Sequence, residues 1–151
     1  MNGNKVQNLY QLFLRLAIGI SYFFFGADRL GLWGKYGDKN VSWGDWGHFM
    51  EYASKVMGFL PFGLAQVFAG MATACEITFG IMLIIGLKTR YAAIGSGALS
   101  LLFALSMTVS FGIFKPLAYS VFTVSAASFL LSTINEYKYT VDRLYQSRIK
   151  N

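Results

Sequence analysis

The chain has 151 residues, of which 55% are hydrophobic, 17% are aromatic and only 13% are charged, and its formal net charge is +6. Soluble domains usually carry about 25% charged residues, and a domain of this size could not bury so much apolar surface, so the composition indicates an integral membrane protein. The basic residues lie at the ends of apolar segments and in the C-terminal tail, which is typical of membrane topology and disfavours a nucleic-acid-binding protein. The single cysteine, Cys75, excludes an internal disulfide.

The first predicted membrane span covers residues 9–30. Its apolar run is longer than the 7–15 residues of a signal peptide core and no A-x-A cleavage site follows, so we expect an uncleaved helix. One stripe of this helix carries Arg15, Gly19, Tyr22, Gly26 and Arg29. The glycines favour close helix packing, and the two arginines are expected to snorkel to opposite interfaces.

The section from 31 to 62 is the longest polar part of the chain, and its first ten residues are rich in turn formers. Ser42 and Asp45 are candidate N-caps for an amphipathic helix at 43–60. Three tryptophans lie in or near this helix, so it is expected to lie along the membrane interface. The only histidine, His48, has no neighbouring pattern of metal ligands and is interpreted as a solvated interfacial residue.

Three further spans are predicted at 63–87, 91–113 and 117–135, followed by a basic tail at 136–151. Residues 86–90, which include Gly86, Thr89 and Arg90, form a short turn that makes the second and third spans antiparallel neighbours. Four spans place both termini on one side, and the distribution of Lys and Arg places that side in the cytoplasm. The predicted fold is therefore an all-α membrane protein, an antiparallel four-helix bundle with an interfacial helix between the first two spans.

Glu76 is the notable residue of the second span, because it is a carboxylate near the middle of an apolar segment. An ionisable group at that depth costs about 2.5–3.5 kcal/mol on insertion scales, so it usually has a partner or a function. On a helix it shares a face with Gly80 and other small residues, where a second helix can approach closely. Helical side chains lean toward the N-terminus, so Glu76 and Arg29 lean toward each other. We expect the two to pair, directly or through water, with Tyr22 on the same stripe.

Several motifs recur in an order that resembles one known family. They are Arg15-Leu16, then Gly19, Gly26 and Arg29, then Leu60-Pro61, then Gly70, Glu76 and Gly80, then the run from Gly86 to Ala93, and finally Tyr139 to Asp142. The chain resembles the DoxX family of small four-helix membrane proteins over nearly its whole length. That family is named with reference to a thiosulfate:quinone oxidoreductase, so the resemblance implies quinone-linked sulfur or thiol chemistry in the inner membrane of a bacterial cell.

Two functions follow from these observations. In the first, the protein is a subunit or accessory of a quinone-linked redox system, in which Glu76, Tyr22 and Arg29 line an outward-opening polar pocket and handle protons for a quinol. A bound quinone is then the one cofactor expected, with no intrinsic cofactor and no metal. In the second, the protein is a non-catalytic assembly or chaperone module that docks on a membrane or periplasmic protein, or on another copy of itself. Whether the chain is itself an enzyme is left open by the sequence.

Overall fold

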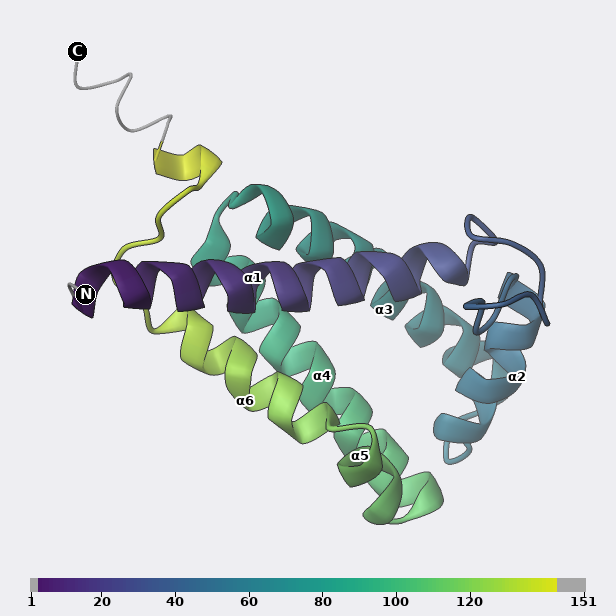
Figure 1. The fold of residues 1–151 in the computed structure, drawn as a ribbon. Coiled ribbons are helices and arrows are strands. Elements are labelled where there is room, and N and C mark those ends of the chain that lie inside the picture. The colour runs from purple at the N-terminus through teal and green to yellow at the C-terminus, as the bar shows by residue number, and fades with distance from the viewer. Residues whose placement is uncertain (1–2, 144–151) are drawn as a thin grey trace.

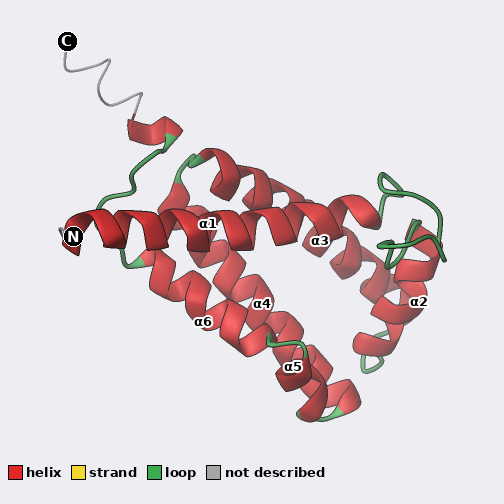
Figure 2. Ribbon diagram, viewed as in Figure 1, coloured by secondary structure: helices red, strands yellow, loops and turns green. Residues whose placement is uncertain are grey.

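The computed structural model describes residues 3–143, and every regular element in that range is a helix (Figure 2). The helices, in chain order, are α1 (Gly3–Asp28), α2 (Trp46–Val56), α3 (Phe62–Ile85), α4 (Thr89–Phe111), α5 (Phe114–Ala118) and α6 (Val121–Ser132), with one more helical turn at 141–143. The all-α class expected from the sequence is confirmed. The part of the predicted tail beyond residue 143 lies outside the described residues.

Within residues 3–143, three helices are long and apolar enough to cross a membrane: Lys5–Asp28 within α1, all of α3 and all of α4. The fourth expected span, at 117–135, differs from the prediction. Ser120 has a left-handed backbone (φ 55°), so the segment breaks into α5 and α6 instead of forming one helix. The 12 residues of α6 rise only about 18 Å, which is less than the roughly 30 Å thickness of the hydrocarbon core.

The helices form a wedge (Figure 1). Helix α1 packs against α3, α4 packs against α6, and the two pairs meet near the N-terminus and spread apart toward the opposite end. The core at the narrow end is built from Ile18, Tyr22, Leu83, Ala92, Ala93 and Leu131. At the wide end, α2 lies across the opening and contacts both α3 and α4.

Helix α2 is joined to both arms of the wedge by specific contacts. On the α3 side, Phe49, Met50 and Ala53 form a second core cluster with Ala69. On the α4 side, Ser110 donates a hydrogen bond of 2.7 Å to the carbonyl oxygen of Val56. Asp45 is the N-cap and accepts from the backbone N–H of His48, as one of the two predicted caps. Helix α2 is therefore a strut at the wide end, shorter than the 43–60 helix expected.

Close contact between α1 and α3 depends on glycine, as the small-residue stripes predict. A Cβ atom at Gly80 would lie 2.8 Å from the backbone nitrogen of Phe23 and 2.9 Å from the carbonyl oxygen of Gly19. A Cβ atom at Gly26 would lie 2.6 Å from the side chain of Ile77. The two helices can approach this closely because Gly80 and Gly26 carry no side chain where they face the other helix.

The turn between α3 and α4 is tight, as predicted. Gly86 and Lys88 have left-handed backbones (φ 74° and 44°), Thr89 starts α4 as a buried residue, and Arg90 is exposed. The chain after α6 folds back onto this turn, so that the backbone N–H of Asp142 donates to the carbonyl oxygen of Gly86 over 3.3 Å. The C-terminal segment is thus part of the narrow end.

Candidate functional site

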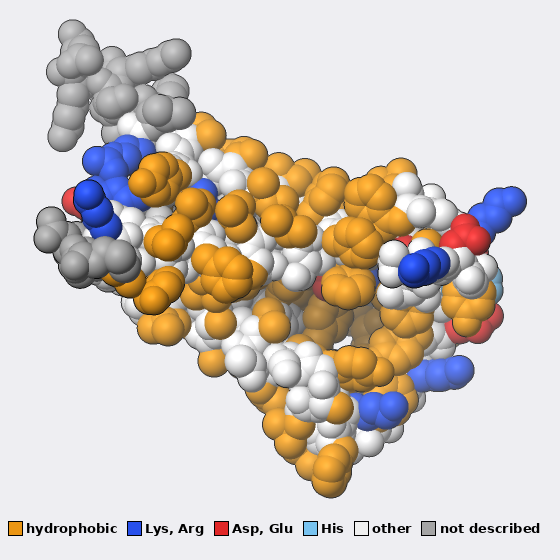
Figure 3. Space-filling model, viewed as in Figure 1, with side chains coloured by type: hydrophobic (Ala, Val, Ile, Leu, Met, Phe, Trp, Pro, Cys, Tyr) orange, Lys and Arg blue, Asp and Glu red, His pale blue; other side chains and the backbone are white. Residues whose placement is uncertain are grey.

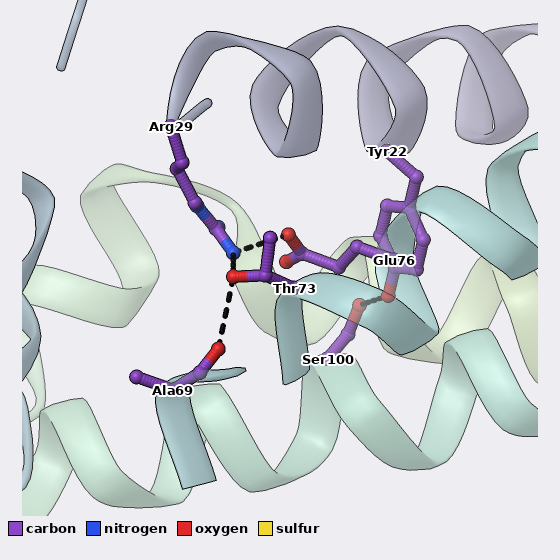
Figure 4. Close-up of polar contacts among 6 residues, drawn as sticks. All are labelled: Tyr22, Arg29, Ala69, Thr73, Glu76 and Ser100. Atoms are coloured by element: carbon purple, nitrogen blue, oxygen red, sulfur yellow. Dashed lines mark hydrogen bonds and ion pairs between the residues drawn. The ribbon is translucent and has the colours of Figure 1, made fainter. Parts of the chain in front are cut away.

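An ion pair between Arg29 and Glu76 lies between α1 and α3 (Figure 4). The Nη1 atom of Arg29 is 2.6 Å from Oε2 of Glu76, and the two residues are only 8% and 5% exposed. Arg29 immediately follows the last residue of α1, and Glu76 lies in the second half of α3. The partner expected for Glu76 is therefore found, and the contact is direct.

Arg29 is held by side chains from two helices, α3 and α2. Its Nη1 also donates to Oγ1 of Thr73 over 3.0 Å, and that hydroxyl donates to the carbonyl oxygen of Ala69 over 2.9 Å. The guanidinium carbon lies 4.2 Å from the centre of the Phe49 ring on α2, which is a cation–π geometry. The expectation that Arg29 snorkels to an interface is wrong, because the carboxylate, the hydroxyl and the ring hold it inside the fold.

Tyr22 belongs to a neighbouring contact and not to the ion pair itself. Its hydroxyl donates to the carbonyl oxygen of Ser96 over 2.7 Å and contacts Oγ of Ser100, both on α4 (Figure 4). Among the described residues it makes no hydrogen bond to Glu76 or Arg29. Tyr22 and Arg29 therefore contact different helices: Tyr22 binds α4, and Arg29, which follows α1, binds α3.

Some buried polar atoms of this region have no hydrogen-bond partner in the described part of the chain, namely Nε of Arg29, Oγ of Ser96 and Oε2 of Glu76. The last of these faces Nη1 of Arg29 at 2.6 Å and is paired with it by charge, so, of these three, the atoms without any partner among residues 3–143 are the Nε of Arg29 and the Oγ of Ser96. Figure 3 shows the molecule hollowed between α1, α2 and α4 at the wide end of the wedge. The region therefore has unused capacity to donate and accept hydrogen bonds.

Asp28 is a second buried carboxylate, to which the sequence analysis gave no role. It is fully buried, and its Oδ2 accepts hydrogen bonds of 2.9 Å from the backbone N–H groups of Ser42 and Trp43. These bonds attach the loop before α2 to the end of α1, next to Arg29. The only signal in the sequence was an acidic residue at the end of an apolar span.

Arg15 lies at the narrow end and is not part of the ion-pair site. It is only 2% exposed, and its Nη2 donates to the carbonyl oxygen of Tyr139 over 2.8 Å, while Nη1 reaches the carbonyl of Lys138 at 3.4 Å. The expected snorkelling of Arg15 is wrong, because the segment after α6 folds over it and supplies carbonyl acceptors. Arg15 therefore anchors the C-terminal segment to α1.

His48 lies at the wide end, where its side chain is 39% exposed. Its Nδ1 lies 2.7 Å from Oδ2 of Asp45, and its ring stacks on Tyr36 with ring centres 3.8 Å apart. Within residues 3–143, no group of three or more His, Cys, Asp or Glu side chains is placed to hold a metal ion. These contacts give His48 a local role beside the cap of α2.

The chain matches one protein-family model, that of DoxX, over residues 10–111. This range covers more than half of the 151 residues, ends with the last residue of α4 and includes Tyr22, Arg29 and Glu76. No curated protein and no solved structure matches the chain.

Proposed function

The chain belongs to the DoxX family, and we propose that it is a membrane subunit or accessory of a quinone-linked redox system that acts on sulfur or thiol compounds. The polar centre of this function is the buried Arg29–Glu76 pair. The observation that carries the proposal is an ion pair, buried between two membrane-length helices, that leaves the Nε of Arg29 without an acceptor in the described chain.

The residues of the site fit the chemistry of a quinone. Such a ligand has an apolar ring and carbonyl oxygens that accept hydrogen bonds, so its site needs apolar walls and a few buried donors. The Nε–H of Arg29 is a buried donor without an acceptor among the described residues. Phe49 on α2 offers an aromatic surface beside it, and the hollow in Figure 3 offers space at the same end of the wedge.

Each side chain of the site has a specific role in this proposal. Bound quinone supplies the two-electron chemistry. Glu76 holds or releases a proton at its carboxylate oxygens, and Arg29 stabilises the charged form at 2.6 Å. Thr73 fixes the guanidinium through a 3.0 Å hydrogen bond, and Phe49 covers it. Tyr22 positions α1 against α4 and so maintains the shape of the hollow.

We further propose that the protein lies in the inner membrane of a bacterial cell with its narrow end toward the cytoplasm. Basic residues exceed acidic ones more strongly at that end, which carries Lys5, Lys88, Arg90, Lys138 and Arg143 with Glu136 and Asp142, than at the wide end, which carries Lys35, Lys39, Lys55 and Lys115 with Asp38, Asp45 and Glu51. This asymmetry follows the positive-inside rule. Helix α2, with Phe49, Met50 and Ala53 on its buried face, then lies along the outer interface.

Native mass spectrometry of the protein released from its own membrane in mild detergent tests the proposal. We expect a retained quinone that is lost in Glu76→Gln, while Glu51→Gln, the same change at an exposed position of α2, keeps it. A protein partner in stoichiometric amount with no small redox molecule would refute the redox role. That result would favour the assembly or chaperone module as the function.

A further inference from the structure

A cavity of about 500 Å³ lies at the narrow end of the wedge, remote from the ion-pair site. It is lined by Asn8 of α1, Ile85 at the end of α3, residues 138–141 and Arg143. The segment that forms one wall is held in place, since Gln11 and Arg15 both donate to the carbonyl oxygen of Lys138. The cavity is therefore a feature of the folded chain.

The lining of this cavity is positively charged. It includes Lys138 and Arg143 and no carboxylate. Lys138 does pair with Glu136 at 2.7 Å, but the Glu136 side chain is 76% exposed, and such surface pairs contribute little. An adjacent cavity of about 510 Å³ has Glu136 itself in its lining together with Lys138, so its fixed charges cancel. The two cavities differ in charge although they share Asn8 and Lys138.

Apolar side chains surround the positive cavity. Ile85 and Val141 are each 42% exposed, and Leu9 and Phe13 of α1 are exposed large hydrophobic residues at the same end. Figure 3 shows Lys and Arg side chains gathered beside apolar ones at this end of the molecule. A ligand that satisfies both surfaces carries an anionic group for the cations and hydrocarbon for the exposed apolar residues.

We propose that this cavity binds the headgroup of an anionic phospholipid. Arg143 and Lys138 contact the phosphate, Asn8 provides a polar contact, and the acyl chains run along the apolar surface beside Ile85. The amphipathic surroundings favour a lipid over a free inorganic anion, because a free anion would use only the charged part of the site. A bound lipid would hold the C-terminal segment between α1 and the α3–α4 turn.

The test measures lipid binding to the full-length, delipidated protein by native mass spectrometry, with phosphatidylglycerol, phosphatidylcholine and inorganic phosphate as probes. We expect phosphatidylglycerol to bind more tightly than phosphatidylcholine. Arg143→Gln and Lys138→Gln should each weaken phosphatidylglycerol binding about fivefold, and Arg143→Lys should restore most of it. Thermal unfolding of each variant in detergent checks that the fold is intact.

Lys35→Gln is the matched control, since it removes a cation from the loop before α2 at the opposite end. It should leave phosphatidylglycerol binding unchanged. Equal losses in Lys35→Gln and Arg143→Gln would overturn the proposal, because binding would then reflect net charge alone. Equal binding of the two lipids would also overturn it. Inorganic phosphate that binds as tightly as phosphatidylglycerol and is lost in Arg143→Gln would show a free-anion site instead.

Discussion

The buried charged residues of the described chain, which are Arg15, Asp28 and the Arg29–Glu76 pair, are stabilised by three different arrangements. The guanidinium of Arg29 contacts a carboxylate, a hydroxyl and an aromatic ring. Asp28 accepts hydrogen bonds from two backbone N–H groups, and Arg15 donates hydrogen bonds to two backbone carbonyl oxygens. A buried charge is tolerated only when such partners replace the water that it loses. Arg29 differs from the other two because its principal partner, Glu76, is itself an ionisable side chain.

Asp28→Ala should release the loop that precedes α2. The change removes two charge-assisted hydrogen bonds, each worth about 1.5–3 kcal/mol, and leaves the N–H groups of Ser42 and Trp43 without their acceptor. We expect faster amide hydrogen exchange at these two residues and a lower melting temperature. Asp38→Ala is the control, since Asp38 accepts one exposed backbone hydrogen bond from Lys35. Unchanged exchange at Ser42 and Trp43 would contradict this role for Asp28.

The sequence predicted the partner of Glu76 but not those of Arg15 and Asp28, for a physical reason. Glu76 and Arg29 were both assigned to regular spans, so helical geometry gave their faces and the direction in which each side chain leans. The partners of Arg15 and Asp28 are backbone groups of irregular segments, at 138–139 and 42–43. Their positions depend on tertiary folding, and no spacing in the sequence encodes them.

At the scale of elements, α1 and α3 form one packed unit whose contact depends on small residues. Gly19 and Gly80 face each other so closely that the carbonyl oxygen of each would touch a Cβ atom on the other. This contact lies one turn from Glu76 along α3, so it sets how near the carboxylate comes to α1. The small-residue stripe could be recognised in the sequence because it depends only on helical periodicity.

Gly80→Ala should separate α1 from α3. The new Cβ atom would meet backbone atoms of Phe23 and Gly19, which cannot move aside without shifting a helix, so we expect a loss of about 1–3 kcal/mol. Gly70→Ala is the matched control on the same helix, because nothing lies within 4 Å of its added Cβ atom. It should stabilise α3 by about 0.5–1 kcal/mol. Thermal unfolding in detergent measures both, and equal effects would argue against the close contact.

The cap of α2 should respond to acid. The pKa of the Asp45 carboxyl lies below its ordinary value, because the carboxylate accepts hydrogen bonds from the backbone N–H and then the ring of His48. Because its pKa is lowered in the folded chain, the ionised carboxyl stabilises the helix fully at pH values above the pKa of the unfolded chain, about 3.9. This contribution is lost as the pH falls through the lowered pKa of the folded chain. The NMR signal of the His48 amide should therefore report the titration of the Asp45 carboxyl at a pH below the ordinary pKa of an aspartate. Asp45→Asn should abolish that titration, and a titration that persists would assign it to another group.

At the scale of the whole molecule, the protein is a wedge closed by a strut and not a regular four-helix bundle. Hydropathy and turn residues act locally, so they could predict the membrane class, the three long helices and the α3–α4 turn. The break at Ser120 could not, because serine tolerates a helix and only the local backbone shows its left-handed conformation. The spreading of the two helix pairs also depends on tertiary contacts, such as that of α2 with α4.

The pairing of Arg29 with Glu76 is the central feature of the site, and a double-mutant cycle on unfolding in detergent tests it most directly. Arg29→Gln and Glu76→Gln should each cost about 3–5 kcal/mol, since each leaves one buried charge without its partner. The double variant should be no less stable than the worse single variant. Arg15→Gln combined with Glu76→Gln is the control, and there the losses should add, because Arg15 binds the C-terminal segment. Additive losses for Arg29 and Glu76 would contradict the pairing and the site built on it.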